Sequence, residues 1–302
     1  MDEATARDRA SSGLLLGLGA YLIWGFLPAF LKLLGHVSAL EILAHRIIWS
    51  VVLLAGTVLI LKRQAAVVAV LKSPRLVGLL AITALLVGVN WLIYIWAVNS
   101  AHVLEASLGY FINPLLNVAL GMAVLREKLD RAQVAAVALA AVGVIYLGAA
   151  QGDLPWISLG LAFTFSLYGL LRKMAPVDPV TGLLVETLLM APPALLWIGY
   201  VQAGGHGSFG VTLSTDLLLV AAGGLTMIPL LLFAAAAKRL RYATLGLLQF
   251  LAPSLQFALA VFAYHEPVTR AHAVAFAFIW TGLLIFAADA IRAERSRRLA
   301  SL

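Results

Sequence analysis

The chain has 302 residues, of which 63% are hydrophobic and only 12% are charged, and its formal net charge is +7. This composition lies outside the range of soluble domains and within that of polytopic membrane proteins. It argues against a soluble enzyme and against a nucleic-acid-binding domain. The chain contains no cysteine, which excludes disulfides, thiol catalysis and thiolate metal sites.

Ten apolar stretches are predicted to cross the membrane. A helix rises about 1.5 Å per residue and the hydrocarbon layer is about 30 Å thick, so each crossing needs about 20 apolar residues. In chain order the predicted spans are Gly13–Leu34, Ala39–Leu61, Leu76–Val98, Val103–Leu125, Ala132–Ala149, Trp156–Leu171, Thr181–Val201, Leu217–Ala237, Thr244–Tyr264 and Ala271–Ala290. The connections are too short for a soluble catalytic domain. We therefore expect an all-α integral membrane protein that is not an enzyme.

Lysine and arginine are distributed unevenly between the two sides of these spans. If the amino terminus is cytoplasmic, all 21 lysines and arginines except Lys32, Arg46 and Arg270 fall in inner segments. Cytoplasmic loops of membrane proteins carry such an excess. The pattern predicts ten crossings with both termini in the cytoplasm, and a first span that is retained as a signal anchor.

The sequence of the first half returns in the second half. Five residues recur 139 positions later: Phe111 as Phe250, Pro114 as Pro253, Glu127 as Glu266, Arg131 as Arg270 and Gly143 as Gly282. Because each copy holds five spans, the second copy enters the membrane from the opposite side, an arrangement typical of secondary transporters. We expect two inverted five-helix repeats, residues 1–150 and 151–302, that together form one membrane domain.

The recurring charged residues lie between the fourth and fifth spans of each half. These predicted structural junctions are Glu127 with Arg131 and Glu266 with Arg270. Asp130 and Thr269 are good helix N-caps, and Gln133 is placed for a capping box. The acidic residue can also interact with the nearby basic one. Capping explains the spacing without a substrate.

Prolines within spans predict bends, because proline lacks an amide hydrogen and its ring clashes with the preceding turn. Pro114 and Pro253 fall near the middle of the fourth and ninth spans, and Pro28 and Pro229 lie in the first and eighth. These bends are either hinges for transport or static kinks needed for packing.

Charged residues within spans give the clearest indication of a site. Arg46 lies about 10 Å inside the second span by helical rise, at a depth where a charge must face protein, water or a counter-charge. Glu41 and His45 share a face of the same span and are candidates for carrying or sensing a proton. Glu186 is the matching charge of the second half. Arg46 and Glu186 either form an ion pair that only joins helices or take part in substrate binding or gating.

Aromatic and amide side chains along the spans predict a central cavity with mostly apolar walls and a few polar groups that orient a ligand. The candidate lining residues are Trp24, Arg46, Asn90, Trp91, Tyr94, Tyr110, Asn113, Asn117, Tyr168, Gln249 and Gln256. Each one alone could serve only packing between helices, whereas the set favours a cavity. The sequence contains no phosphate-binding glycine loop, zinc motif or nucleophile elbow, so we expect neither a cofactor nor a metal.

Several of these segments carry a family resemblance. They are Ile23–Pro28, the pairs His45-Arg46 and Asn90-Trp91, Glu105–Pro114 and Gly224–Leu230. Together they resemble the RarD branch of the EamA family, within the drug/metabolite transporter superfamily, over nearly the whole chain. The resemblance implies a bacterial inner-membrane carrier whose cavity is lined chiefly by spans one, three, four, six, eight and nine. RarD-like proteins are labelled chloramphenicol-sensitive permeases, and relatives export amino acids, other metabolites and drugs. Gln249-Phe250 departs from the Gln-Tyr that is frequent in the family.

The sequence thus predicts an alternating-access secondary transporter, with export as the favoured direction, for small amphipathic metabolites or drugs. Its partners would be a small-molecule solute and the lipid bilayer, not nucleic acid, and a homodimer stays open. The alternatives are an uncoupled facilitator or importer of the same solutes, a non-transporting membrane partner or sensor, and a membrane-embedded lipid enzyme.

Overall fold

The computed structural model describes residues 3–126, 130–151, 156–240, 244–245 and 248–300, and these residues form helices and connecting turns without any strand. The helices, in chain order, are α1 (Glu3–Leu33), α2 (Ala39–Ile60), α3 (Gln64–Leu71), α4 (Pro74–Asn99), α5 (Val103–Leu125), α6 (Arg131–Gln151), α7 (Trp156–Met174), α8 (Pro179–Ala203), α9 (Leu213–Ala237), α11 (Leu251–Ala258), the π-helix η1 (Leu259–Ala263) and α12 (Arg270–Ala300). The short helix α3 was not predicted.

Seven of the described helices are long and apolar enough to cross a bilayer. These seven spans are Ser11–Leu33, Ala39–Ile60, Pro74–Asn99, Val103–Leu125, Arg131–Ala150, Pro179–Ala203 and Leu213–Ala237. The chain is therefore a multi-pass membrane protein. The other three predicted spans fall on α7, on α11 with η1, and on α12.

The ninth predicted span differs most from the structure. Within Thr244–Tyr264, the described residues are helical at 244, 245 and 248 and form a turn at 249–250, which precedes the eight-residue α11 and the π-helical turn η1. Pro253 was expected near the middle of a helix but is the third residue of α11. Proline is tolerated in a first turn, where its missing amide hydrogen has no partner to lose, so Pro253 does not bend α11. Pro28, Pro114 and Pro229 do lie inside α1, α5 and α9.

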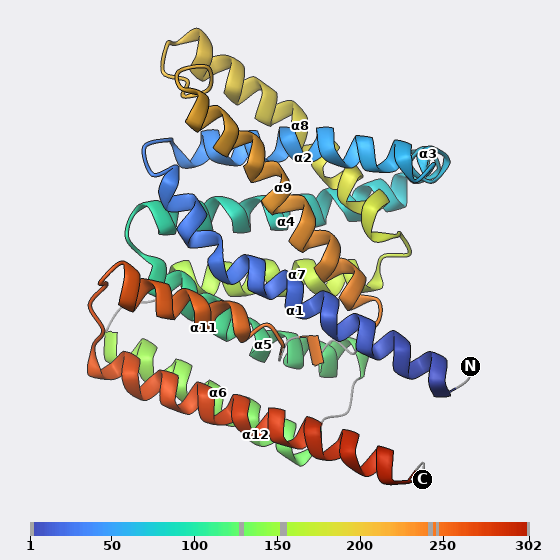
Figure 1. Cartoon of the computed structure of the whole chain (residues 1–302), viewed down its shortest axis with the longest axis vertical. Coiled ribbons are helices and arrows are strands. Elements are labelled where there is room, and N and C mark those ends of the chain that lie inside the picture. The colour runs from blue at the N-terminus through green and yellow to red at the C-terminus, as the bar shows by residue number, and fades with distance from the viewer. Residues whose placement is uncertain (1–2, 127–129, 152–155, 241–243, 246–247, 301–302) are drawn as a thin grey trace.

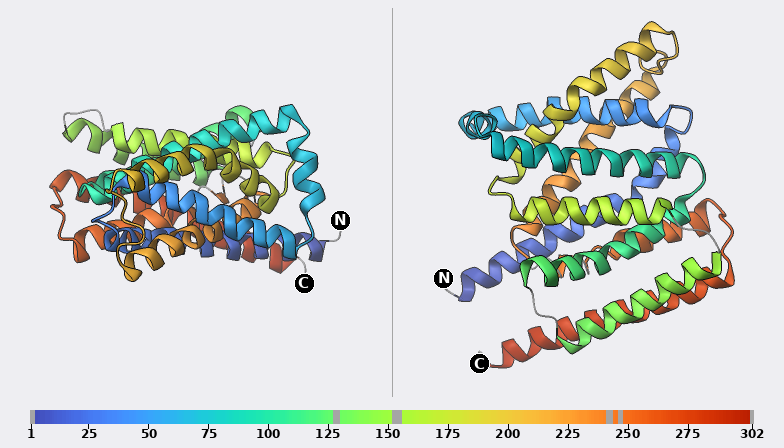
Figure 2. Two further views of the ribbon diagram at one scale, coloured as in Figure 1. Left: turned by 90° about the horizontal axis from the view of Figure 1, so that it is seen from above. Right: turned by 180° about the vertical axis from the view of Figure 1, so that it is seen from behind.

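The helices lie side by side in one bundle, and α1 begins at the end of the bundle where α12 finishes (Figure 1). Figure 2 shows the same arrangement from behind, with α6 and α12 adjacent along their length. Helix α6 begins at the end where the two chain termini lie, whereas α12 begins at the opposite end. These two helices, which occupy equivalent places in the two halves, therefore run in opposite directions.

Contacts between helices follow the same pattern when the two halves are exchanged. Helix α5 packs on α7 as α11 packs on α1, and α4 packs on α7 and α8 as α9 packs on α1 and α2. Glycines allow close contact between α6 and α12. A Cβ added at Gly143 would lie 2.7 Å from the carbonyl oxygen of Ala275, and one added at Gly282 would lie 2.7 Å from that of Ala136. Both glycines and both alanines are 139 positions apart, so the two contacts are equivalent.

The junctions before α6 and α12 also share a local structure. Arg126 and His265, again 139 positions apart, both have left-handed backbone conformations, with φ of 55° and 53°. The predicted capping box is present: the Asp130 amide donates to Gln133 Oε1 (3.2 Å) and the Gln133 amide donates to Asp130 Oδ1 (2.8 Å). Thr269 and His272 bond each other in the same way before α12.

The acidic junction residue Glu266 has a different partner from the one expected. Glu266 Oε2 accepts a hydrogen bond from the Leu104 amide in the first turn of α5, at 3.0 Å, and not from the nearby Arg270. This carboxylate satisfies one of the free amides at a helix start, so Glu266 joins the end of the second half to the first half. Glu127 lies outside the described residues. Arg131 and Arg270 are the first residues of α6 and α12 and are exposed.

Candidate functional site

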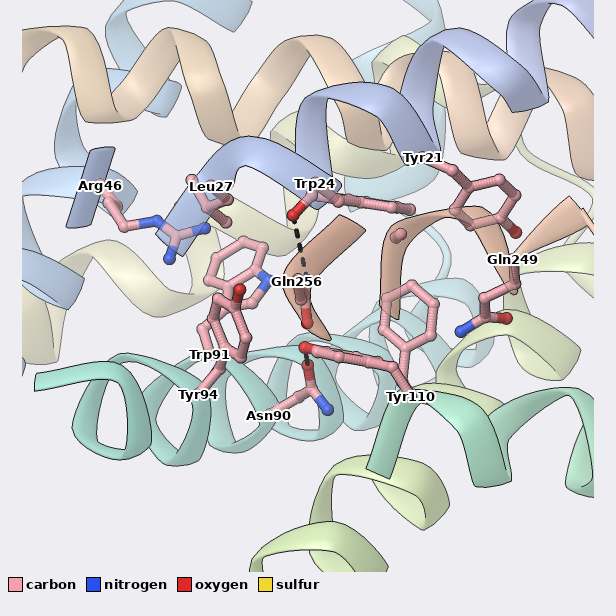
Figure 3. Close-up of a pocket in the computed structure, with 12 residues that line it drawn as sticks. Tyr21, Trp24, Leu27, Arg46, Asn90, Trp91, Tyr94, Tyr110, Gln249 and Gln256 are labelled. Atoms are coloured by element: carbon pink, nitrogen blue, oxygen red, sulfur yellow. Dashed lines mark hydrogen bonds between the residues drawn. The ribbon is translucent and has the colours of Figure 1, made fainter. Parts of the chain in front are cut away.

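A small cavity lies where helices from both halves of the chain meet (Figure 3). Twelve side chains line its volume of about 30 Å³: Tyr21, Trp24, Leu27, Arg46, Asn90, Trp91, Tyr94, Tyr110, Phe165, Gln249, Ala252 and Gln256. They come from α1, α2, α4, α5, α7 and α11, and Gln249 comes from the segment that leads into α11. Eight of the eleven predicted lining residues are among them. Helix α2 contributes Arg46, which the resemblance did not place at the cavity wall, while α9 contributes none of the twelve.

Arg46 is the one charged residue among the twelve, and it is 2% exposed. Its Nε donates to Thr226 Oγ1 on α9 at 2.8 Å, and its guanidinium lies 5.2 Å from the ring centre of Trp91. Its Nη1 has no hydrogen-bond partner among the described residues. The guanidinium is therefore held in place by a hydroxyl and an aromatic face without a carboxylate at the cavity wall.

Aromatic rings form most of the wall. Trp24 meets Phe165 edge-on with ring centres 5.5 Å apart, and Tyr110 contacts both Phe165 (6.2 Å) and Tyr94 (5.4 Å). Such tilted contacts are favourable for aromatic pairs. These rings fix an apolar chamber with Arg46 at one end, as Figure 3 shows.

Two amide side chains are fixed within this wall. The Tyr110 hydroxyl donates to Asn90 Oδ1 at 3.3 Å, and the Asn90 amide donates to the Leu161 carbonyl at 3.0 Å. The Gln256 amide donates to the Trp24 carbonyl at 3.0 Å, which leaves Gln256 Oε1 without a partner among the described residues. The cavity wall thus also offers an acceptor, at Gln256, which lies between Arg46 and Gln249 in Figure 3.

Three predicted lining residues lie outside the cavity. Asn113 Oδ1 accepts a hydrogen bond from Ser166 at 2.9 Å, and Asn117 donates to Gln249 Oε1 at 3.0 Å from behind the wall. Tyr168 is buried beside Arg172 and Glu186. Tyr21 and Phe165, which the sequence analysis did not select, occupy the cavity wall instead.

Glu186 pairs with Arg172 and not with Arg46, so the predicted pair between Arg46 and Glu186 is wrong. Arg172 Nε lies 3.6 Å from Glu186 Oε1, and Thr83 Oγ1 donates to the same oxygen at 2.6 Å. Both charged side chains are at most 2% exposed. The cluster joins α4, α7 and α8. Arg172 was expected in a cytoplasmic connection, whereas it lies within the last turn of α7 and is buried.

Glu41 and His45 share a face of α2, as predicted, and are covered by the connection between α8 and α9. Glu41 accepts hydrogen bonds from the amide and hydroxyl of Ser208, at 2.6 and 3.0 Å. Phe209 stacks on the His45 ring with centres 4.9 Å apart. His45 Nε2 has no hydrogen-bond partner in the described part of the chain. Residues 204–212, which we term the α8–α9 loop, therefore close over the start of α2.

Nothing in the described ranges resembles a metal centre, since they hold no group of three histidine, aspartate or glutamate side chains placed to bind an ion. The arrangement is instead a closed, mostly aromatic chamber with one cation, enclosed by apolar helices. A mostly apolar chamber with a few polar groups, enclosed between membrane-spanning helices from both halves of the chain, is typical of a membrane transporter.

The first 149 residues contain a match to the family model described as "EamA-like transporter family", over residues 11–149. Protein RarD of Salmonella typhi is 49% identical over 286 residues, which cover 94% of this chain and 97% of that protein. An uncharacterized transporter of Vibrio cholerae is also 49% identical, over 96% of this chain and 97% of that protein. A solved crystal structure aligns with a TM-score of 0.67 and 26% identity, covering 94% of this chain and 99% of its own. The chain belongs to the EamA family of transporters, in its RarD branch.

Proposed function

We propose that this protein is a secondary transporter of the bacterial inner membrane that exports small amphipathic metabolites or drugs by alternating access. Residues 1–150 and 151–302 would be two inverted five-helix repeats, with both termini in the cytoplasm. The opposite directions of α6 and α12 and the equivalent contacts of Gly143 and Gly282 support this arrangement. Inverted repeats that place a site at their interface are typical of secondary transporters.

The observation that carries the proposal is the cavity between the two halves. Arg46, Trp91 and Tyr94 come from the first half, whereas Phe165, Gln249 and Gln256 come from the second. Movement of one half against the other would therefore change the cavity directly. Its volume of about 30 Å³ accommodates about two water molecules, while ligand pockets usually measure about 300–1,000 Å³. In this proposal the helices separate before a solute enters, and the structure would represent a state of the cycle in which the cavity is contracted.

Two polar clusters are placed to act as gates at opposite ends of the bundle. At one end, the α8–α9 loop contacts Glu41 and His45 at the start of α2. At the other end, the cluster of Arg172 and Glu186 joins α4, α7 and α8 near the end of α7. Alternating access requires that one end opens while the other stays closed. Glu41, His45 and Glu186 are the titratable groups that would couple such opening to a proton. Pro28, Pro114 and Pro229 would allow α1, α5 and α9 to bend.

Transport is tested with the purified full chain in liposomes. Flux of radiolabelled 3-phenylpropanoate, phenylalanine and chloramphenicol is compared with flux into protein-free liposomes. At least one solute should move faster with protein, and Arg46→Ala should abolish that flux. Arg75→Ala, which changes an exposed arginine at the start of α4, is the matched control and should retain it. If none of the three solutes moves faster than in protein-free liposomes, transport of this solute class is wrong.

The inverted arrangement is tested separately, by labelling single cysteines. The chain has no native cysteine, so no background thiol has to be removed first. Arg131→Cys and Arg270→Cys place single thiols at equivalent, exposed positions of the two junctions. A membrane-impermeant maleimide should label Arg131→Cys only from the cytoplasmic side and Arg270→Cys only from the outside. Labelling of both from one side would overturn the inverted repeat.

A further inference from the structure

We infer that the cavity recognises a monoanionic aromatic acid, whose carboxylate is bound by Arg46 and Tyr94. This inference rests on the proposed transport function and specifies its substrate. Arg46 Nη1 and the Tyr94 hydroxyl are both buried without a hydrogen-bond partner among the described residues. Their side chains are 2% and 3% exposed. Figure 3 shows them together at one end of the cavity, beside the ring of Trp91.

The charge of the cavity selects the charge of the ligand. A buried guanidinium is unfavourable unless it meets a counter-charge or water, and Thr226 with Trp91 satisfies only part of Arg46. None of the twelve lining residues is acidic. An incoming carboxylate would supply the missing charge and accept hydrogen bonds from two donors. A phosphate monoester carries a charge near −2, which a single guanidinium would leave partly unbalanced.

The shape and polarity of the other end favour an aromatic body. Trp24, Phe165 and Tyr110 surround the space with ring faces and edges, which pack well against a planar ring. The side-chain nitrogen of Gln256 donates to the Trp24 carbonyl, while Gln256 Oε1 has no donor among the described residues. A hydroxyl on the ring of the ligand would supply that donor.

The same geometry disfavours α-amino acids and neutral drugs. An α-amino acid carries its ammonium on the carbon next to the carboxylate, so that ammonium would be close to the Arg46 guanidinium. Two like charges repel strongly at short range in a medium of low dielectric, and the wall has no carboxylate to offset the repulsion. A neutral amphenicol would leave Arg46 without its counter-charge. The cavity therefore discriminates by charge among molecules of similar size.

Three probes of one carbon skeleton separate these effects: 3-phenylpropanoate, its uncharged amide 3-phenylpropanamide, and zwitterionic phenylalanine. Binding to the purified full chain is measured by titration calorimetry in detergent above the carboxylate pKa. The acid should bind at least about tenfold more tightly than either other probe, because the amide cannot form the charge-assisted hydrogen bond and the ammonium of phenylalanine is repelled by Arg46. The 4-hydroxy derivative of the acid should bind more tightly still.

Variants then locate the binding groups. Arg46→Met should weaken binding of the acid at least about tenfold, and Tyr94→Phe should weaken it several-fold, while binding of the amide should change little in either. Thermal unfolding without ligand checks that each variant is folded. If Arg46→Met does not fold, Tyr94→Phe still tests the assigned groups. Arg75→Ala should bind all probes as the wild type does.

The outcomes separate this inference from the transport proposal. If the amide or phenylalanine binds as tightly as the acid and is transported, the substrate class is wrong while transport stands. If the acid binds equally well to Arg46→Met and Tyr94→Phe, the assigned groups are wrong. If the acid binds through Arg46 but no probe crosses proteoliposomes, the binding chemistry is correct and the transport proposal fails.

Discussion

Two arginines are buried among the described side chains of this bundle, and their surroundings differ in one respect. Arg172 has Glu186 within 3.6 Å and Thr83 beside that carboxylate, while Arg46 has a hydroxyl and an indole ring but no acidic residue at the cavity wall. A charge with its own counter-charge fastens helices together. A charge without one is costly for folding alone and is therefore the group available to a ligand. From the sequence, Arg46 was expected inside a span and Arg172 in a connection. Their different roles follow only from the partners that the structure gives them.

The largest expected effect comes from breaking the paired cluster. Glu186→Ala would leave the Arg172 guanidinium buried without compensation, which costs about 3–5 kcal/mol of stability. Unfolding of the purified protein in sodium dodecyl sulfate, followed by tryptophan fluorescence, measures this loss. The double variant Arg172→Met with Glu186→Met removes both charges and should regain most of it. A Glu186→Ala protein as stable as the wild type would show that the pair does not fasten the bundle.

A smaller effect is expected when Arg46 loses its internal hydrogen bond. Thr226→Val removes the acceptor of Arg46 Nε, and a lost hydrogen bond to a buried charge costs about 1.5–3 kcal/mol. The same unfolding titration measures it. If Arg46 depends on Thr226 for its position, 3-phenylpropanoate binding should weaken in parallel. Thr226→Ser keeps the hydroxyl and is the matched control, so a similar loss in both variants would point to packing and not to the hydrogen bond.

The depth of these residues could be predicted from the sequence, but their orientation and partners could not. Helical rise placed Arg46 and Glu186 within spans, and apolar length predicted the seven long helices. In a chain that is apolar on all sides of its helices, the pattern does not indicate which face of α2 or α8 meets which neighbour. Arg172 lies close to the end of a span. The local sequence there does not indicate whether the side chain of an arginine points into the bundle or away from it.

The aromatic wall and the α8–α9 loop also depend on contacts that the sequence could not predict. Tyr21 and Phe165 are ordinary members of apolar helices until the folded chain brings α1 and α7 together. Ser208 and Phe209 reach Glu41 and His45 across 167 and 164 positions of the chain, and no local pattern predicts such contacts. By contrast, the capping box at Asp130 and Gln133 is local, and its prediction is confirmed.

Removal of Arg46 should affect stability less than breaking the paired cluster. Arg46→Met replaces a charge that lacks a carboxylate by an apolar side chain of similar length, and Thr226 Oγ1 still donates to the Ala222 carbonyl. The free energy of unfolding should therefore change by about 1 kcal/mol or less, in contrast to Glu186→Ala. Sodium dodecyl sulfate unfolding of both variants side by side makes this comparison. Equal losses for the two would remove the distinction between a fastening and a binding arginine.

A third arginine extends the comparison to the surface, where the smallest effect is expected. Arg63 Nη1 lies 2.7 Å from Asp178 Oδ1, with side chains 44% and 30% exposed, and such exposed pairs contribute about 0–1 kcal/mol. Asp178 also caps α8 by accepting from the amides of Val180 and Thr181. Partial burial raises the pKa of Asp178, but the hydrogen bonds from Thr181 and the charge of Arg63 outweigh it and hold that pKa below its usual value.

The pH dependence of this surface pair follows from the sign of that shift. A carboxyl whose pKa is lower in the folded state contributes stability above its unfolded pKa of about 3.9 and loses the contribution as pH falls through the folded value. Asp178→Asn should therefore lower the unfolding temperature at pH 7, and the difference from the wild type should shrink below about pH 4. Arg63→Ala should produce a smaller decrease that 1 M salt largely removes, because exposed charges are screened. A salt-independent decrease would mean that Arg63 acts by packing and not through its charge.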